Sequence, residues 1–211
     1  MISELLEHRY HHIVIVDDGS DQDIISEVSD LPVYYIRHPI NLGQGAALQT
    51  GFDFAKQLPC DVVVTFDGDG QHDCREIASL VQPVASGEAD IIFGSRFLIG
   101  NTKNLPPSRK FILTCARFIN YLFTGLLLTD AHNGLRAFHP KLLHVLRLTE
   151  NRMAHATEIL YQVKKHRLRY REVGVNIRYT NYSKGKGQSD WNSIRIFSDL
   201  VLHKLFRSSS K

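Results

Sequence analysis

The sequence predicts an α/β fold built around a mostly parallel sheet, and three observations support this class. Short apolar runs typical of buried strands alternate with longer segments of helical periodicity. Acidic and glycine-rich clusters follow these runs directly, where the strands would end. The 211 residues, 43% of them hydrophobic and 22% charged, have the composition of one globular domain rather than of a disordered chain.

The first half of the chain repeats a strand and helix alternation. Apolar runs predict strands at residues 13–16, 33–36, 62–66 and 91–93. Helical patterns between them predict helices at residues 21–29, 45–58 and 73–86. This order predicts βαβ units, which place their strands in a parallel sheet.

The second half begins after Gly94 with a loop that contains Pro106 and Pro107. Residues 111–128 are largely apolar, but Arg117 and Asn120 interrupt them, so an amphipathic or buried helix is expected rather than a membrane span. A turn at Gly134, a helix at residues 154–165 and a strand at residues 172–178 follow. We expect residues 1–211 to form a single domain in which this half covers the sheet.

Charge and cysteine content exclude several classes of protein. The 25 basic and 22 acidic residues give a net charge of +3, too mild for a nucleic-acid-binding protein. Three cysteines form no disulfide framework, and the N-terminus lacks the basic region of a signal peptide, so we expect a cytoplasmic protein. Basic residues crowd into positions 164–186, where they form either a solvated face or a surface for an anionic ligand or lipid.

The first polar cluster is Asp17-Asp18-Gly19-Ser20, directly after a predicted buried strand. In open α/β sheets the ligand crevice lies beyond the carboxyl ends of the strands, so these carboxylates are placed to accept hydrogen bonds from a base or ribose. Alternatively, Asp18 and Ser20 only shape the turn or cap the next helix. The sequence leaves both roles open.

The second cluster, residues 41–48, contains Gly43 and Gly45 between a predicted strand and a predicted helix. Small residues allow close approach of a ligand, and a helix N-terminus favours an anion. However, Leu48 stands where a dinucleotide-binding fingerprint has its third glycine. A packing role and a ligand role for Gly45 therefore remain equally open.

The third cluster, Asp67-Gly68-Asp69-Gly70-Gln71, follows the apolar run at residues 62–66. Asp67, Asp69 and Gln71 offer oxygen ligands for a hard divalent cation. Such an ion would bind a diphosphate and neutralise the charge that develops on a departing nucleoside diphosphate. An alternative is a haloacid dehalogenase-type phosphatase in which Asp67 attacks phosphorus and Asp69 acts as acid and base.

The ordered motifs together resemble those of family 2 glycosyltransferases, and most closely the dolichyl- or polyprenyl-phosphate sugar synthase branch. They are Asp17-Asp18-Gly19-Ser20, Asn41-x-Gly43-x-Gly45, Asp67-x-Asp69-x-Gln71-His72, Gly94-Ser95-Arg96 and Asp130 with Asn133-Gly134-Leu135-Arg136-Ala137-Phe138. The resemblance implies a GT-A fold with helices on both faces of the sheet, a nucleoside-diphosphate sugar donor, Mg²⁺ or Mn²⁺, and transfer with inversion. The implied acceptor is a polyprenyl phosphate or another molecule at the inner membrane face, where the protein would be peripheral.

The resemblance also implies roles for individual residues. Asp17, Asp18, Gly45, Asp67, Arg96 and Lys184 would bind the nucleotide sugar, and Asp67, Asp69 and Gln71 would hold the metal. Asp130 and Arg136 are the catalytic candidates. Asp130 would act as general base toward a hydroxyl acceptor, whereas an ionised lipid phosphate needs no base; a structural alternative is that Asp130 bridges Arg136.

The family normally begins with an apolar strand that lies centrally in the sheet and is followed by a helix leading to Asp17, and here no such strand precedes the helix-like residues 2–9. We therefore expect either a chain shortened at its start or a rearranged sheet, in which the neighbouring strands lack hydrogen-bond partners. This departure keeps a second function open, that of a catalytically weak nucleotide-sugar-binding or partner-binding relative. The sequence does not define the oligomeric state.

Overall fold

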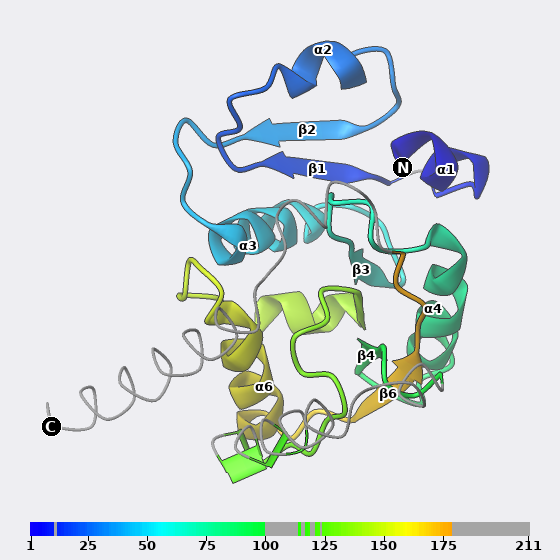
Figure 1. The fold of residues 1–211 in the computed structure, drawn as a ribbon, viewed down its shortest axis with the longest axis vertical. Coiled ribbons are helices and arrows are strands. Elements are labelled where there is room, and N and C mark those ends of the chain that lie inside the picture. Colours follow the sequence, from blue (N-terminus) through cyan, green and yellow to red (C-terminus); the bar gives the residue numbers. More distant parts are fainter. Residues whose placement is uncertain (11, 100–113, 115–116, 119–120, 123, 179–211) are drawn as a thin grey trace, which may run out of the picture. The chain divides into compact units, whose positions relative to one another are not determined.

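The computed structural model describes residues 1–10, 12–99, 114, 117–118, 121–122 and 124–178. The predicted basic loop with Lys184 lies outside the described residues, as does much of the apolar segment 111–128. The elements in chain order are α1 (Ile2–Glu7), β1 (Val14–Asp17), α2 (Ile24–Val28), β2 (Tyr34–Arg37), α3 (Gln44–Ala55), β3 (Val63–Thr65), η1 (Cys74–Glu76), α4 (Ile77–Ala85), β4 (Ile91–Ser95), β5 (Arg136–Phe138), η2 (Pro140–His144), α6 (His155–Lys165) and β6 (Tyr170–Gly174) (Figure 1).

Each strand and helix predicted above from residues 13–93 and 154–178 is present, with its ends shifted by a few residues. Side-chain caps explain two of the helix starts. The Asp23 carboxylate accepts a hydrogen bond from the Ser26 N–H at the start of α2. In the same way, the Asp73 carboxylate accepts from the Arg75 N–H at the start of η1, which continues directly into α4.

The strands form two sheets rather than one. β1 and β2 pair in parallel, and the second sheet has the order β3-β5-β4-β6. β4 and β6 are parallel, but β5 runs antiparallel to both β3 and β4. The sequence did not predict β5 as a strand, so the expectation of a mostly parallel sheet is corrected to a mixed arrangement.

The division falls between β1 and β3. Among the described residues, each of these strands has a neighbour on one side only. Their side chains still share an apolar cluster, because Ile13 beside β1 and Val64 of β3 both pack against buried Leu5, Cys74 and Ile77. In the described part of the chain, each of these two strands therefore has one edge without a neighbouring strand.

Helices cover both faces of the four-stranded sheet. On one face, Ile91, Phe93 and Phe138 belong to a core cluster with residues of α3 and α6. On the other face, Ile92 and Ala137 pack with Leu80 and Val84 of α4. Successive residues of β4 and β5 thus point to opposite faces, as the strand period requires. Packing on both faces fixes the position of the strands, and the polar clusters follow the ends of these strands.

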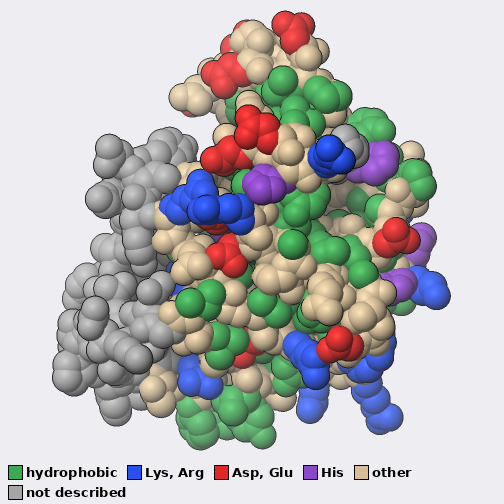
Figure 2. All heavy atoms as spheres, turned by 90° about the vertical axis from the view of Figure 1, so that its right-hand side faces the viewer, with side chains coloured by type: hydrophobic (Ala, Val, Ile, Leu, Met, Phe, Trp, Pro, Cys, Tyr) green, Lys and Arg blue, Asp and Glu red, His purple; other side chains and the backbone are tan. Residues whose placement is uncertain are grey.

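The side of the molecule that carries α1 and α4 shows acidic and basic side chains scattered among apolar and uncharged ones (Figure 2). Arg178 makes ion pairs there with Asp73, at 2.8 Å, and with Glu4, at 3.4 Å. Asp73 also pairs with Arg75 at 2.5 Å. Arg178 therefore belongs to an ion-pair network within the protein. It is one of the basic residues in the segment 164–186 described above.

Candidate functional site at the carboxyl ends of the strands

The predicted polar clusters lie at one edge of the sheets. Asp17 ends β1, Asp67 follows β3, and Arg96 follows β4. Because β5 is antiparallel to β3 and β4, its first residue, Arg136, lies at the same edge, opposite Thr65 and Phe93 in the register. The antiparallel strand that the sequence did not reveal is thus the element that brings Arg136 to the acidic cluster.

Asp17 is enclosed by partners within the chain. Its side chain is fully buried, and its carboxylate accepts hydrogen bonds from the Tyr35 hydroxyl at 2.7 Å and the Ser20 N–H at 2.8 Å. Burial alone would raise the pKa of Asp17, but these hydrogen bonds and the nearby Arg37 charge hold the pKa below its ordinary value. The observed contacts of Asp17 are those of a structural carboxylate.

Asp18 organises the loop that precedes α3. Its carboxylate accepts hydrogen bonds from the N–H groups of Leu42, at 2.9 Å, and Gly43, at 2.7 Å. The His38 ring joins Asp18, at 2.8 Å, to the Thr50 hydroxyl on α3, at 2.9 Å. Burial opposes ionisation, yet these contacts lower the pKa of Asp18. Asp18 thereby fixes the entrance to α3.

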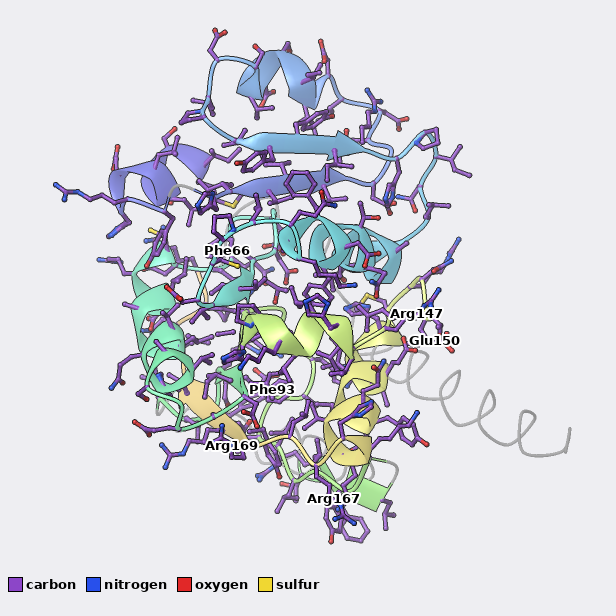
Figure 3. The ribbon with its side chains drawn as sticks, turned by 180° about the vertical axis from the view of Figure 1, so that it is seen from behind. Phe66, Phe93, Arg147, Glu150, Arg167 and Arg169 are labelled. Atoms are coloured by element: carbon purple, nitrogen blue, oxygen red, sulfur yellow. The ribbon has the colours of Figure 1, made fainter. Side chains whose placement is uncertain are left out.

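Gly45 occupies a position where the backbone of another segment comes very close. A Cβ atom at Gly45 would lie 2.0 Å from the Glu150 carbonyl oxygen, and the Gly45 N–H donates to the Asn151 carbonyl at 2.8 Å. Glu150 is labelled beside α6 in Figure 3. Since the Ala46 N–H also donates to Asn151, a carbonyl group occupies the N-terminus of α3. Of the two roles left open by the sequence, the described contacts favour packing.

Asp67 is the more accessible acid, with a side chain that is 30% exposed. Its carboxylate accepts hydrogen bonds from Gln44 Nε2 at 2.9 Å and His72 Nε2 at 3.2 Å. Burial would raise the pKa of Asp67, but the His72 hydrogen bond and the charges of His72, Arg136 and His155 lower it overall. Asp67 is therefore ionised at neutral pH.

Gly134 approaches Asp67 closely. A Cβ atom at this position would lie 2.0 Å from Asp67 Oδ2, and the Gly134 carbonyl accepts a hydrogen bond from the Thr65 hydroxyl at 2.6 Å. Glycine at position 134 is thus needed for the observed place of the Asp67 carboxylate. This requirement explains the glycine in the motif at residues 133–138.

Asp69 and Gln71 contact each other through the backbone. The Asp69 carboxylate accepts a hydrogen bond from the Gln71 N–H at 2.9 Å, which closes a tight turn. Both side chains are partly buried. Within the described part of the chain, however, no group of three or more His, Cys, Asp or Glu side chains converges as a metal cage. The predicted ligands share one turn without forming a complete coordination shell.

Arg136 is a buried cation between two acids. It is 2% exposed, and its guanidinium donates to the Ala131 carbonyl at 3.2 Å and lies 5.6 Å from the centre of the Phe93 ring. Burial lowers the pKa of Arg136 to about 10, while Asp67 and Asp130 oppose this effect. Arg136 remains charged at neutral pH, and its Nε atom is buried without a hydrogen-bond partner.

Arg96 and Asp130 form a two-point ion pair. Arg96 Nε and Nη2 donate to the two oxygens of Asp130 at 2.6 and 2.8 Å, and the Arg96 N–H adds a third bond at 3.1 Å. Asp130 is 3% exposed, whereas the Arg96 side chain is 40% exposed. The structural alternative for Asp130 named Arg136 as its partner; the partner that the structure gives is Arg96.

Glu172 of β6 binds the backbone next to the ion pair between Arg96 and Asp130. Its carboxylate accepts hydrogen bonds from the N–H groups of Thr129, at 2.7 Å, and Asp130, at 3.0 Å. It also accepts from the Thr129 hydroxyl, which contacts Ser95 Oγ at 2.5 Å. Glu172 therefore fixes the backbone that holds Asp130, a role that the sequence did not indicate.

Three histidines, His72, His132 and His155, lie near the acids and Arg136. His72 is 5% exposed, and its Nδ1 atom is buried without a partner. Desolvation by the surrounding protein and the Arg136 charge lower the pKa of His132, although this residue is exposed at the surface, and burial lowers the pKa of His155. His72 and His132 lie within recognised motifs, but His155 comes from α6 and had no local sequence signal.

A divalent cation fits this edge if substrate oxygens complete its shell. Asp67 and Asp69 supply the hard oxygen donors that Mg²⁺ and Mn²⁺ prefer. Mg²⁺ sites commonly use one or two carboxylates together with substrate phosphates rather than a cage made only of protein. The absence of a three-residue cage among the described residues is therefore compatible with a metal that binds together with a diphosphate.

The fold and this arrangement of acids, arginines and glycines define an α/β protein whose polar site lies at the carboxyl ends of its strands. The sequence model of glycosyl transferase family 2 matches residues 2–147. The chain therefore belongs to glycosyl transferase family 2. This membership favours the glycosyltransferase interpretation of Asp67 over the phosphatase interpretation.

Curated relatives extend the match. A UDP-N-acetylglucosamine–dolichyl-phosphate N-acetylglucosaminyltransferase of Methanococcus voltae is 34% identical, over 97% of this chain and 90% of the relative. A polyprenol monophosphomannose synthase of Mycolicibacterium smegmatis is 30% identical, over 65% of this chain and 54% of the relative. The similarity to the first relative spans nearly the whole chain, beyond the family match.

Solved structures support the fold. The glucosyl-3-phosphoglycerate synthase of Mycobacterium tuberculosis has a TM-score of 0.60 at 18% identity, over 84% of this chain and 65% of that chain. The same enzyme in complex with Mn²⁺ and UDP-glucose has a TM-score of 0.56 at 19% identity, over 80% of this chain and 60% of that chain. The expected GT-A fold is confirmed, and this chain spans less than two thirds of the length of those structures.

Proposed function

We propose that this glycosyltransferase moves a sugar, with inversion, from a nucleoside-diphosphate sugar to a polyprenyl phosphate. The observation that carries the proposal is the two-point pair between Arg96 and Asp130. A hydroxyl acceptor requires a base, and Asp130, the acceptor-side candidate, already has both oxygens bonded to Arg96. A lipid phosphate arrives ionised and needs no base. The names of the relatives, which include dolichyl and polyprenol acceptors, support the same class.

On the donor side, Asp67 and Asp69 would hold Mg²⁺ or Mn²⁺ against the diphosphate, with Gln71 as a further oxygen ligand. The bound ion supplies the positive charge that neutralises the departing nucleoside diphosphate. His72 and Gln44 keep the Asp67 carboxylate in place. Arg136, charged and buried beside Asp67, adds fixed positive potential at the same edge.

Arg96 is the arginine that would meet phosphate, because its side chain is 40% exposed and its Nε and Nη2 edge is fixed by Asp130. A planar guanidinium fork matches phosphate oxygens well. Asp17, Asp18 and Gly45 would act on the donor mainly by shaping the loops beside it, since their observed contacts are internal. Lys184 remains a prediction for the donor diphosphate, outside the described residues.

The test is the melting temperature of the full chain with nucleoside diphosphates and nucleotide sugars, each with and without Mn²⁺. A donor at about 100 times its dissociation constant should raise the melting temperature by about 5–10 °C. Asp69→Ala should abolish the metal-dependent part of this shift. The control, Asp61→Ala, changes an exposed acid just before β3 and should leave the shift intact.

Turnover is measured next, with the identified donor and a short-chain polyprenyl phosphate that is soluble in water. Sugar transfer to this acceptor supports the proposal. A donor that binds with Mn²⁺ but is transferred only to hydroxyl acceptors would overturn the acceptor assignment. Binding without any transfer would favour the catalytically weak relative.

A further inference from the structure

Residues 147–151, the bridging segment, lie between η2 and α6 and belong to no helix or strand. Side chains from two helices nevertheless bind their backbone. The Arg147 N–H donates to Gln162 Oε1 of α6 at 2.9 Å, and Gln162 Nε2 donates to the Arg147 carbonyl at 2.6 Å. The Leu148 N–H donates to Gln49 of α3 at 2.7 Å. The backbone hydrogen bonds that an irregular segment cannot make with itself are thus made with α3 and α6.

Glu158 of α6 binds the middle of the bridging segment. Its Oε2 atom accepts hydrogen bonds from the Thr149 N–H, at 2.9 Å, and from the Glu150 N–H, at 3.0 Å. Its Oε1 atom accepts from the Thr149 hydroxyl at 2.7 Å. Figure 3 shows Arg147 and Glu150 between α3 and the start of α6. One carboxylate therefore fixes two consecutive backbone groups of the bridging segment.

The end of the bridging segment packs directly on the backbone of α3 at two glycines. A Cβ atom at Gly43 would lie 2.4 Å from the Asn151 carbonyl oxygen, and one at Gly45 would lie 2.0 Å from the Glu150 carbonyl oxygen. The Asn151 carbonyl also accepts a hydrogen bond from the Gly45 N–H at 2.8 Å. Because backbone packs on backbone here, a shift of residues 150 and 151 would also move the first turn of α3.

Gln44 stands between these two glycines, and its side chain reaches the site. Its Nε2 atom donates a hydrogen bond to Asp67 Oδ1 at 2.9 Å. The orientation of a carboxylate that binds a metal depends on outer hydrogen bonds of this kind. A continuous series of contacts therefore connects Glu158, through the bridging segment and Gln44, to Asp67.

We propose that Glu158 is a positioning residue, which sets the affinity of the site for its divalent cation through the bridging segment and Gln44. This inference rests on the proposed function, because the cation is part of it. Without the Glu158 carboxylate, the N–H groups of Thr149 and Glu150 lose their acceptor and the bridging segment shifts. The first turn of α3 follows, and the Gln44 amide no longer holds Asp67 in place.

Two substitutions separate the hydrogen bonds of Glu158 from its charge. Glu158→Leu removes every acceptor atom. Glu158→Gln keeps an oxygen at the place of Oε2 for both backbone N–H groups, while its amide nitrogen donates to the Thr149 hydroxyl. We expect the leucine variant to need about fivefold more Mn²⁺ than the wild type, and the glutamine variant to stay within about twofold.

The measurement is the melting temperature of the full chain at a fixed concentration of UDP or GDP, whichever stabilises the wild type more. The readout is the Mn²⁺ concentration that gives half of the metal-dependent shift, so neither acceptor nor turnover is needed. The control, Gln162→Leu, removes two hydrogen bonds from the same segment at Arg147, away from Gly43 and Gly45. It should lower the melting temperature without ligand but leave the Mn²⁺ requirement within about twofold.

A double-mutant cycle tests the route through Gln44. Gln44→Leu alone should raise the Mn²⁺ requirement about 10-fold. If Glu158 acts through Gln44, adding Glu158→Leu to this variant should change the requirement by less than about twofold, because the contact that it positions is already lost. A further fivefold rise in the double variant would show two independent effects and overturn the proposed route.

A wild-type Mn²⁺ requirement in Glu158→Leu would overturn the proposal, and so would a glutamine variant as impaired as the leucine variant, because charge rather than hydrogen bonding would then be responsible. If Glu158→Leu does not fold, Glu158→Asp, which is one carbon shorter, gives the same test. Absence of a Mn²⁺-dependent shift in the wild type would overturn the metal assignment and this proposal with it. Absence of transfer to a polyprenyl phosphate would count against the proposed function alone, because the measurement uses no acceptor.

Discussion

Two acidic pairs in this molecule follow the same sequence pattern but have different surroundings. Asp17-Asp18 and Asp67-x-Asp69 each come at the end of an apolar strand. The Asp17 side chain is fully buried and is hydrogen-bonded to Ser20 and Tyr35, just after β1 and in β2. The Asp67 side chain, by contrast, is 30% exposed. The first pair holds loops together, and the second faces the site.

The two acidic pairs also differ in the hydrogen bonding of the residues around them. Two of the buried side-chain polar atoms that lack a partner are His72 Nδ1 and Arg136 Nε, and both residues adjoin Asp67. Buried polar groups in native proteins are nearly always hydrogen-bonded, so each exception needs an explanation. His72 Nδ1 and Arg136 Nε are both buried, so within the described part of the chain the surroundings of Asp67 leave two polar atoms unpaired, whereas Asp17 has hydrogen-bond partners within the chain.

The largest expected effect comes from Asp67→Asn, which keeps the shape of the side chain and removes its charge. Turnover should fall at least about 100-fold, because even loss of an outer partner of a metal ligand costs 10–100-fold. The measurement is donor turnover across Mn²⁺ concentrations. Retained turnover at saturating Mn²⁺ would mean that Asp67 is not a ligand of the metal.

Gly134→Ala tests the place of the same carboxylate without changing any charge. The new Cβ would lie 2.0 Å from Asp67 Oδ2, so the carboxylate must move. A displacement of this size should cost about 10–100-fold in turnover. Gly68→Ala is the matched control, because no heavy atom outside Gly68 and its two chain neighbours lies within 4 Å of its Cβ position. Equal effects of the two substitutions would contradict the role of Gly134.

His72→Leu and His72→Gln sharpen the comparison through the partner of Asp67. Leucine removes the donor to Asp67, and we expect the Mn²⁺ concentration needed for half-maximal turnover to rise about 10-fold. Glutamine retains an N–H donor near the Nε2 position and should restore much of this loss. A role in packing alone would give two variants with the same Mn²⁺ requirement and a lower melting temperature.

The sequence predicted the strands from their apolar runs and the acids from their places after those runs. It did not predict β5, because Arg136-Ala137-Phe138 is short and begins with a charged residue. The antiparallel place of β5 between β3 and β4 depends on pairing with residues far apart in the chain, which local patterns do not encode.

The candidate site shows the same division. Asp67, Asp69, Arg96 and Arg136 stood in motifs, so their presence at one edge could be predicted. The contribution of His155 from α6 and the support of Asp130 by Glu172 could not, since both depend on the packing of distant elements. For Gly45, only the close approach of the Glu150 carbonyl favoured packing over ligand binding.

The smallest expected effect on donor binding belongs to Asp17→Asn, which should instead lower the free energy of unfolding by about 1–2 kcal/mol, because a charged hydrogen-bond acceptor for Tyr35 is lost. The folded-state pKa of Asp17 lies below its unfolded value. Its contribution is therefore fully present above the unfolded pKa, about 4, and is lost as the pH falls through the folded pKa. Urea unfolding of wild type and variant should differ at pH 7 and converge as the pH falls below about 4. A variant as stable as the wild type at pH 7, but unable to bind donor, would reverse the roles assigned to the two acidic pairs.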